Sequence, residues 1–239
     1  FGHALFFGAG GYVTFVLLSK VDGMTFYPAV ILAVLASVLL ALISGMVTLR
    51  LRGVYFAMFT LAFAEMFWVL AKSGTLRDYT GAEDGLLIRD FVPEALNPTP
   101  TFTGNRLEMY QITLVFFVIV FLAIRRYLNS PVGRVMLSIR ENEERARTIG
   151  YNTVLYKLLT MTFAGMLATL SGVLFVLWTT DKRVKPDLLS LNYTVDPLLY
   201  TLIGGVGTLS GPVISALGLE LGEAYLRDET ITVGSTVYE

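Results

Sequence analysis

The stretch that decides the fold is RRYLNSPVGRVMLSIRENEERARTIGYNTVLYK, residues 125–157. It carries seven basic and three acidic residues, and a long apolar run lies on each side of it. Because the stretch is too polar to cross a bilayer, we expect it to lie in water while the flanking runs cross the membrane. The question is what a water-exposed segment does between two membrane spans.

Local signals inside this stretch predict one short helix at the membrane surface. Ser130 and Pro131 are typical of a helix start, because a serine hydroxyl caps free backbone N–H groups and proline suits the first helical position. Gly150 is suited to end the helix. We expect Asn152 or Thr153 to cap the apolar segment that follows.

The charges of the stretch are spaced for a helix surface. Glu141 and Arg145 are four residues apart with the acid first, and so are Glu143 and Arg147, which is the favourable order. From these residues alone two interpretations stand. The helix is either a surface loop with solvated charges or a docking element for a soluble partner that delivers mechanical work.

The composition of the chain is typical of a membrane protein. Of its 239 residues 54% are hydrophobic and 15% are charged, and the mean hydropathy is +0.65, whereas a soluble domain has about 25% charged residues. The net charge of −1 argues against nucleic acid as a partner. No cysteine is present, so neither a disulfide framework nor a thiolate metal site is expected, and we name no metal site.

The apolar segments predict an all-α fold, a polytopic helical membrane bundle with about six spanning or re-entrant segments. They lie at residues 4–18, 28–49, 54–71, 109–124, 158–178 and 196–221. Glycines in the first run allow either close helix packing or a broken helix. Asp196 and Pro197 are suited to begin the sixth. Because the chain starts inside an apolar run, we expect it to be a fragment that lacks sequence at its N-terminus. Its last dozen residues look like a surface tail or a second truncation.

Ala164, Ala168 and Gly172 are spaced four residues apart in the fifth run, which predicts a stripe for close helix packing. The lone histidine, His3, is interpreted as an interfacial residue at a helix start.

Two features inside apolar runs are candidates for a translocation path. Glu65 is an ionisable group within the third run, and such groups face protein or a water-filled path; a structural hydrogen-bonding partner is the alternative interpretation. Gly204, Gly205 and Gly207 lie in LIGGVGTLSGP, residues 202–212, which lacks the lysine of a phosphate-binding loop. We therefore predict a broken helix or sharp turn there, without a bound nucleotide.

The longest polar connection, residues 72–108, contains the motif TGAEDGL at residues 80–86. Thr80, Gly81 and Gly85 are candidates for a turn that approaches a ligand, although an ordinary turn fits the spacing equally well. The acids between the two glycines are a weak metal candidate, because two adjacent carboxylates rarely complete a coordination shell.

Glu144, Ala146 and Gly150 have the E-x-A-x-x-x-G spacing of the coupling loop in ABC importer permeases, and the chain resembles the branched-chain amino acid ABC transporter permease family. One departure is Arg145, where importers generally have a second alanine. The resemblance extends over residues 2–12, 51–65, 80–86, 130–152 and 202–212, which read GHALFFGAGGY, LRGVYFAMFTLAFAE, TGAEDGL, SPVGRVMLSIRENEERARTIGYN and LIGGVGTLSGP.

The resemblance implies a single transmembrane permease domain over residues 1–239 in the inner (plasma) membrane. Residues 72–108 would be an extracytoplasmic loop and residues 125–157 a cytoplasmic coupling loop. The implied partners are cytoplasmic ATP-binding subunits, a second permease subunit, a periplasmic or extracellular substrate-binding protein and the lipid bilayer. No cofactor is expected on this chain, since the partner subunits bind ATP. The coupling residues would be Arg140, Glu141, Glu144, Arg145, Ala146 and Gly150.

The implied function is ATP-driven import of branched-chain or other hydrophobic amino acids, with no enzymatic activity and no catalytic residue. Relatives that carry urea or short amides are an alternative. An ion-coupled secondary transporter is a second alternative, in which Glu65 and Glu220 would couple the ion. Charge supports the orientation weakly, because a cytoplasmic 125–157 loop puts ten basic residues inside and eight outside.

Overall fold

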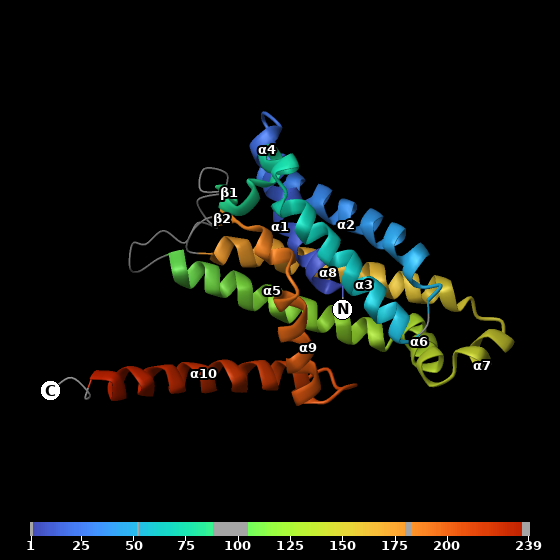
Figure 1. Ribbon diagram of the computed structural model, residues 1–239. Coiled ribbons are helices and arrows are strands. Elements are labelled where there is room, and N and C mark those ends of the chain that lie inside the picture. The colour runs from blue at the N-terminus through green and yellow to red at the C-terminus, as the bar shows by residue number, and fades with distance from the viewer. Residues whose placement is uncertain (1, 52, 88–104, 180–182, 236–239) are drawn as a thin grey trace. The chain divides into compact units, whose positions relative to one another are not determined.

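The computed structural model describes residues 2–51, 53–87, 105–179 and 183–235, whose helices and strands are drawn in Figure 1. The chain divides into two compact units, Phe1–Leu191 and Asn192–Glu239, and each is described by itself. Of the basic residues counted above, Arg52, Arg89 and Lys182 lie outside the described ranges.

The first unit is built on long helices that lie side by side. They are α1 (His3–Lys20), α2 (Phe26–Thr48), α3 (Val54–Lys72), α5 (Asn105–Leu128) and α8 (Thr153–Trp178). Within the described residues four helices are long and apolar enough to cross a membrane, namely α2, α3, α5 from Leu107, and α8. The predicted all-α, polytopic membrane fold is therefore confirmed.

Helix α1 is the buried centre of this unit and is continuous, not broken at its glycines. Its Gly10 lies against the backbone of Thr169 in α8, where a Cβ atom would collide with the Thr169 carbonyl. In the reciprocal contact, Gly172 of α8 lies against the carbonyl of Phe7 in α1. The Thr169 hydroxyl donates a 3.1 Å hydrogen bond to the Phe6 carbonyl. The glycines thus bring two helix backbones into contact.

The packing stripe of α8 differs in part from the predicted one. Gly172 is buried as expected, but Ala164 and Ala168 are only partly buried. Gly165 and Thr169 are the buried residues in this part of the helix. The buried face is therefore turned by about one residue, or roughly 100°, from the predicted line.

Helix α2 presents one face of small residues to its neighbours. Ala29, Ala33, Ser37, Ala41 and Gly45 recur every four residues and are buried. The opposite face exposes large aliphatic side chains, as expected where a helix meets lipid.

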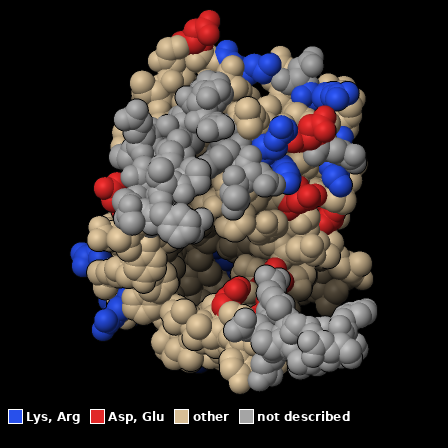
Figure 2. All heavy atoms as spheres, turned by 90° about the vertical axis from the view of Figure 1, so that its left-hand side faces the viewer, with Lys and Arg blue, Asp and Glu red and all other residues tan. Residues whose placement is uncertain are grey.

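One end of the first unit, the sheet end, is closed by short elements. These are η1 (Gly74–Leu76), α4 (Arg77–Thr80), η2 (Ala82–Asp84), β1 (Leu86–Leu87), β2 (Arg183–Val184) and η5 (Pro186–Leu189). The two strands pair antiparallel, with Leu86 opposite Val184. Figure 2 views the molecule from this side and shows acidic and basic side chains interspersed. At this end Lys72 pairs with Asp187 at 3.9 Å.

The opposite end, the α7 end, carries α6 (Pro131–Glu141) and α7 (Glu143–Thr148). Residues from the start of α1, the connection between α2 and α3, and the start of α8 meet α6 and α7 around a pocket of about 490 Å³. His3, Leu51, Met136 and Lys157 are among the residues that line it. His3 begins α1, as the sequence predicted.

Helix α5 packs beside α8 through few side chains. Near the α7 end Tyr127 stacks on Phe163 with ring centroids 4.5 Å apart, and its hydroxyl lies 2.7 Å from that of Thr160. Near the sheet end Trp178 donates a 2.8 Å hydrogen bond to Thr113. Most other side chains of α5 are exposed in the described unit.

The second unit contains α9 (Asn192–Gly204) and α10 (Gly211–Ser235), which pack against each other. The prediction that Asp196 and Pro197 begin a helix is wrong, because α9 starts at Asn192 and Pro197 lies inside it. Pro197 is the sixth residue of α9, so it has no N–H to donate to the carbonyl four residues earlier and the helix lacks that one bond.

Candidate functional site

The stretch between Ser130 and Gly150 folds as two helices, α6 and α7, and not as the single helix that was predicted. The Ser130 hydroxyl accepts a hydrogen bond from the Gly133 N–H at 3.2 Å, which confirms the predicted start at Pro131. The helix then stops at Glu141, because the Asn142 backbone is extended and its side chain caps α7 by accepting from the Arg145 N–H at 2.9 Å. An asparagine side chain competes with the helical backbone in this way.

The end of α7 and the start of α8 follow the predicted signals. Gly150 has a positive φ of +99° and donates to the Arg147 carbonyl at 2.9 Å. The Tyr151 N–H donates to the Ala146 carbonyl at 3.1 Å, so the helix closes with a glycine Schellman motif. Asn152 then caps α8, since its side chain accepts from the Leu155 N–H at 3.2 Å.

A network of charged and polar groups, the latch, ties α7 to α8. Glu143 accepts from Lys157 at 2.7 Å through one oxygen, and from Arg147 at 2.9 Å and Thr153 at 3.1 Å through the other. Arg147 also donates to the Thr153 hydroxyl at 3.0 Å. The Lys157 and Glu143 side chains are only about a quarter exposed, at 26% and 24%. The latch therefore fixes the position of α7 on the first turn of a membrane-spanning helix.

The latch also sets the ionisation of its central acid. The hydrogen bond from Lys157 is the main reason why the pKa of Glu143 lies below its ordinary value. Partial burial acts in the opposite direction, and the charges of Lys157 and Arg147 add to the lowering. Glu143 is thus held in its charged form, which is the form that binds both basic partners.

The predicted coupling residues divide into an outward and an inward set. The outward residues are exposed and consist of Arg140, Glu141, Glu144, Arg145 and Gly150. Ala146 is the inward member, with 3% of its surface exposed. The outward set leaves charged groups of both signs on the surface of the α7 end.

Sequence reasoning found part of the latch. The Glu143–Arg147 pair was visible as an i, i+4 spacing and is confirmed. Lys157 and Thr153 were missed as partners of Glu143, because they follow a turn whose path no local spacing predicts. The predicted pairing of Glu141 with Arg145 assumed one continuous helix, and the break at Asn142 places them on different helices.

Glu65 lies in the interior of α3, near the middle of the span. It is half-buried, next to the buried Ala64 and five residues after the buried Thr60. This position agrees with a polar group that faces other parts of the protein. Its role in translocation stays a prediction.

The glycines at 204, 205 and 207 lie where the helix was predicted to break. Helix α9 ends at Gly204 and α10 begins at Gly211. Gly205 and Gly207 have φ values of +98° and +99°, which glycine adopts without strain. Gly204 and Gly211 lie against each other's backbone. The break is confirmed, and its part in a translocation path stays a prediction.

The candidate loop residues at the sheet end form a tight structural turn. The Thr80 hydroxyl donates to the carbonyls of Ala71 and Leu76 and accepts from the Ala82 N–H at 3.2 Å. Gly81 and Gly85 have positive φ values and lie against neighbouring backbone. These contacts explain the glycines within the protein, and contact with a solute or partner stays a prediction.

Comparisons with known proteins agree with these features. A family model described as "Branched-chain amino acid transport system / permease component" matches residues 1–227. High-affinity branched-chain amino acid transport system permease proteins LivM of Salmonella typhimurium and Escherichia coli are each 26% identical to the chain over 246 residues. Each match covers 95% of this chain and 57% of the relative, so the chain spans just over half their length.

A third relative is archaeal. The probable branched-chain amino acid transport permease protein LivM of Methanocaldococcus jannaschii is 30% identical over 106 residues, which is 44% of this chain and 30% of the relative. No solved structure matches the chain.

Proposed function

The chain belongs to the family of permease components of branched-chain amino acid transport systems, and from that membership we propose that it is a membrane-spanning subunit of an ATP-driven importer. The permease binds no nucleotide, and the cofactor ATP is bound by partner subunits. In this proposal the exposed face of α7 receives those subunits, and helix movement follows their closure.

The observation that carries this proposal is the construction of α7. Its outward face presents Glu144 and Arg145 to water, while its inward face is held by the latch. A partner that pushes or pulls on α7 therefore acts on α8 through Glu143 and Lys157. Helix α8 in turn contacts the buried α1 along its backbone. A displacement at the surface thus has a continuous route into the membrane.

We place the α7 end in the cytoplasm of a cell with an inner or plasma membrane. Arg50 and the basic residues of the 125–157 stretch then lie inside, which agrees with the preference for basic residues in cytoplasmic loops. Lys20, Lys72 and Arg77 lie at the sheet end and would face outside. Support for grouping them there includes the position of Lys20 over the Tyr79 ring, 5.7 Å from its centroid.

The substrates proposed are branched-chain or other hydrophobic amino acids, because the relatives' names give branched-chain amino acid transport. An extracytoplasmic binding protein would deliver them to the sheet end, and a second permease subunit would complete the pore. Import of urea or short amides is the alternative substrate class. Competition between labelled leucine and urea for uptake by the assembled transporter distinguishes the two.

The experiment that tests the coupling role replaces Glu144 by Gln and Gly150 by Ala in the assembled transporter. Glu144→Gln removes an exposed charge from the outward face, and Gly150→Ala strains a left-handed turn. We expect loss of ATP-driven uptake while capture of substrate by the binding protein is retained. Normal uptake in both variants would remove the coupling role.

An ion-coupled secondary transporter is the second candidate, and the half-buried Glu65 in the middle of α3 is the observation that favours it. In this case an imposed ion gradient would drive uptake without ATP, and Glu65→Gln would abolish it. ATP-dependent uptake that Glu65→Gln leaves intact argues for the importer.

A further inference from the structure

Three arginines lie within ten residues of one another in the chain, where α5 ends and α6 begins. Arg125 and Arg126 are in the last turn of α5, and Arg134 is in the first turns of α6. All three are exposed. Among the residues that the structure describes, none of them has a carboxylate oxygen within 4.0 Å. This cluster is separate from the latch, whose basic members are paired.

The local packing places Arg125 and Arg126 on sides of α5 that do not face α8. Tyr127 faces α8, because its ring stacks on Phe163 at 4.5 Å. One residue along a helix turns by about 100°, so Arg125 and Arg126 project from sides of α5 other than the one facing α8. Gly133 lies against the carbonyls of Tyr127 and Leu128, which holds the start of α6 at the end of α5.

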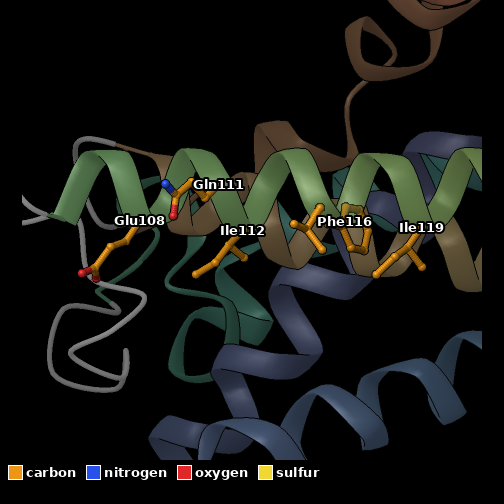
Figure 3. A pocket seen from close by; sticks show the side chains of 6 residues that line it. Glu108, Gln111, Ile112, Phe116 and Ile119 are labelled. Carbon is orange, nitrogen blue, oxygen red and sulfur yellow. The ribbon is translucent and has the colours of Figure 1, made fainter.

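An apolar groove lies along α5 between Glu108 and Ile119, and it ends about 10 Å along the helix axis from Arg126. Figure 3 shows Ile112, Phe116 and Ile119 projecting from the same side of the helix. The groove has a volume of about 570 Å³, and Ile119 at its end is 59% exposed. Leu122 and Arg126 continue the same face at intervals of three and four residues.

The length of this face matches one leaflet of a bilayer. From Arg126 back to Val115 is eleven residues, or about 16 Å along the helix axis. One leaflet accounts for about half of the roughly 30 Å hydrocarbon thickness. An acyl chain that starts at the headgroup level of Arg126 therefore ends beside Val115 and Phe116.

We propose that α5 and the start of α6 form a binding site for an anionic phospholipid. The phosphate group lies among Arg125, Arg126 and Arg134, which supply bidentate donors suited to phosphate oxygens. One acyl chain runs past Leu122 and ends in the near part of the groove, beside Ile119 and Phe116. The site is distinct from solute transport and from docking on α7, and it holds for any transported solute.

The test measures lipid binding to the purified chain in neutral detergent micelles. Phosphatidylglycerol and phosphatidylcholine of equal chain length are titrated, and native mass spectrometry counts the bound lipids. We expect phosphatidylglycerol to be preferred. Replacing all three arginines by Gln should weaken its binding on the order of 100-fold, since each basic residue near the headgroups contributes about fivefold.

One control variant and two further variants test whether the effect is specific to this site. Arg77→Gln removes an arginine at the opposite end of the unit, where Arg77 pairs with Asp84, and should leave binding unchanged. The single variant Arg134→Gln should weaken binding about fivefold and serves if the triple variant does not fold. Ile119→Trp partly fills the groove and should weaken phosphatidylglycerol binding as well.

Four results would overturn the proposal. Equal binding of phosphatidylcholine would remove the role of charge. Unchanged phosphatidylglycerol binding in the arginine variants would remove the site. Competition by soluble glycerol 1-phosphate at the same concentration as the lipid would show an anion site without an acyl-chain groove. If purified ATP-binding subunits displace the lipid completely, the arginines are a protein-docking surface instead.

Discussion

At the scale of single residues, two adjacent glutamates have different surroundings. Glu143 points inward and accepts from three side chains of α7 and α8. Glu144 is exposed on the outward face. Position 143 therefore holds α7 on α8, whereas position 144 lies on the face proposed above for docking. Substitutions at Glu143 and Glu144 can therefore be compared directly, because the two residues are adjacent in the chain but have different surroundings.

The latch predicts that replacing Glu143 lowers stability more than replacing Lys157. Glu143→Gln leaves two basic residues facing each other without an anion, whereas Lys157→Met leaves the Glu143–Arg147 pair intact. Because the side chains are partly exposed, we expect about 1–2 kcal/mol of lost stability for Glu143→Gln and less for Lys157→Met. Thermal unfolding in detergent measures both. Glu144→Gln is the control and should unfold as the wild type does; an equal loss in all three variants would contradict the latch.

The latch also predicts a dependence on pH. The pKa of Glu143 is lowered in the folded protein, chiefly by Lys157, so its contribution to stability is fully present above its ordinary pKa of 4.5. The contribution is lost as the pH falls from there through the lowered pKa. The difference in melting temperature between wild type and Glu143→Gln should be constant from pH 8 to about pH 5 and shrink in more acidic solution. If the difference in melting temperature already shrinks between pH 8 and pH 6, a group other than Glu143 causes the pH dependence.

At the scale of elements, the contact between α1 and α8 depends on glycine. Gly172→Ala places a Cβ atom on the Phe7 carbonyl, and because that atom is backbone, the helices must separate. We expect a loss of about 1–3 kcal/mol, typical of an overpacked core, seen as a lower melting temperature. Gly218→Ala in α10 is the control, since nothing lies within 4 Å of its added Cβ atom. Its helix should be unchanged or slightly more stable.

Elements were predictable where their signals are local. The cap at Ser130, the end of α7 at Gly150 and the cap at Asn152 all depend on residues within four positions of one another. The break at Asn142 was missed because asparagine in a charged run fits either a helix surface or a cap. The start of α9 was misplaced because a proline within the first two turns is hard to distinguish from one at the first position.

At the scale of the whole molecule, apolar runs predicted the membrane fold, but long-range contacts were out of reach. Gly10 and Thr169 are more than 150 residues apart in the sequence, and no periodicity reveals that they touch. The pairing of β1 with β2 at the sheet end has the same character. The candidate path residues share this limit, because a path is defined by elements that come together only in the folded protein.

For the whole molecule we predict that the sheet end and the α7 end lie on opposite sides of the membrane. The chain has no cysteine, so single cysteines report without background. Leu87→Cys at the sheet end and Ile149→Cys at the α7 end are on exposed positions. In right-side-out vesicles we expect a membrane-impermeant maleimide to label the cysteine at position 87. The cysteine at position 149 should be labelled only after the vesicles are lysed. Leu39→Cys, in the middle of α2, should stay unlabelled in both, and labelling of positions 87 and 149 from one side would refute the topology.

The backbone contact between α1 and α8 has a consequence for motion. Two helices that interlock through glycines cannot slide along each other without lifting apart, so they act as one rigid body. Helix α5 is different, since Tyr127, Thr113 and a few other side chains connect it to α8. Of the two, α5 is therefore the element that can move against the fixed α1–α8 pair with the fewer contacts to break.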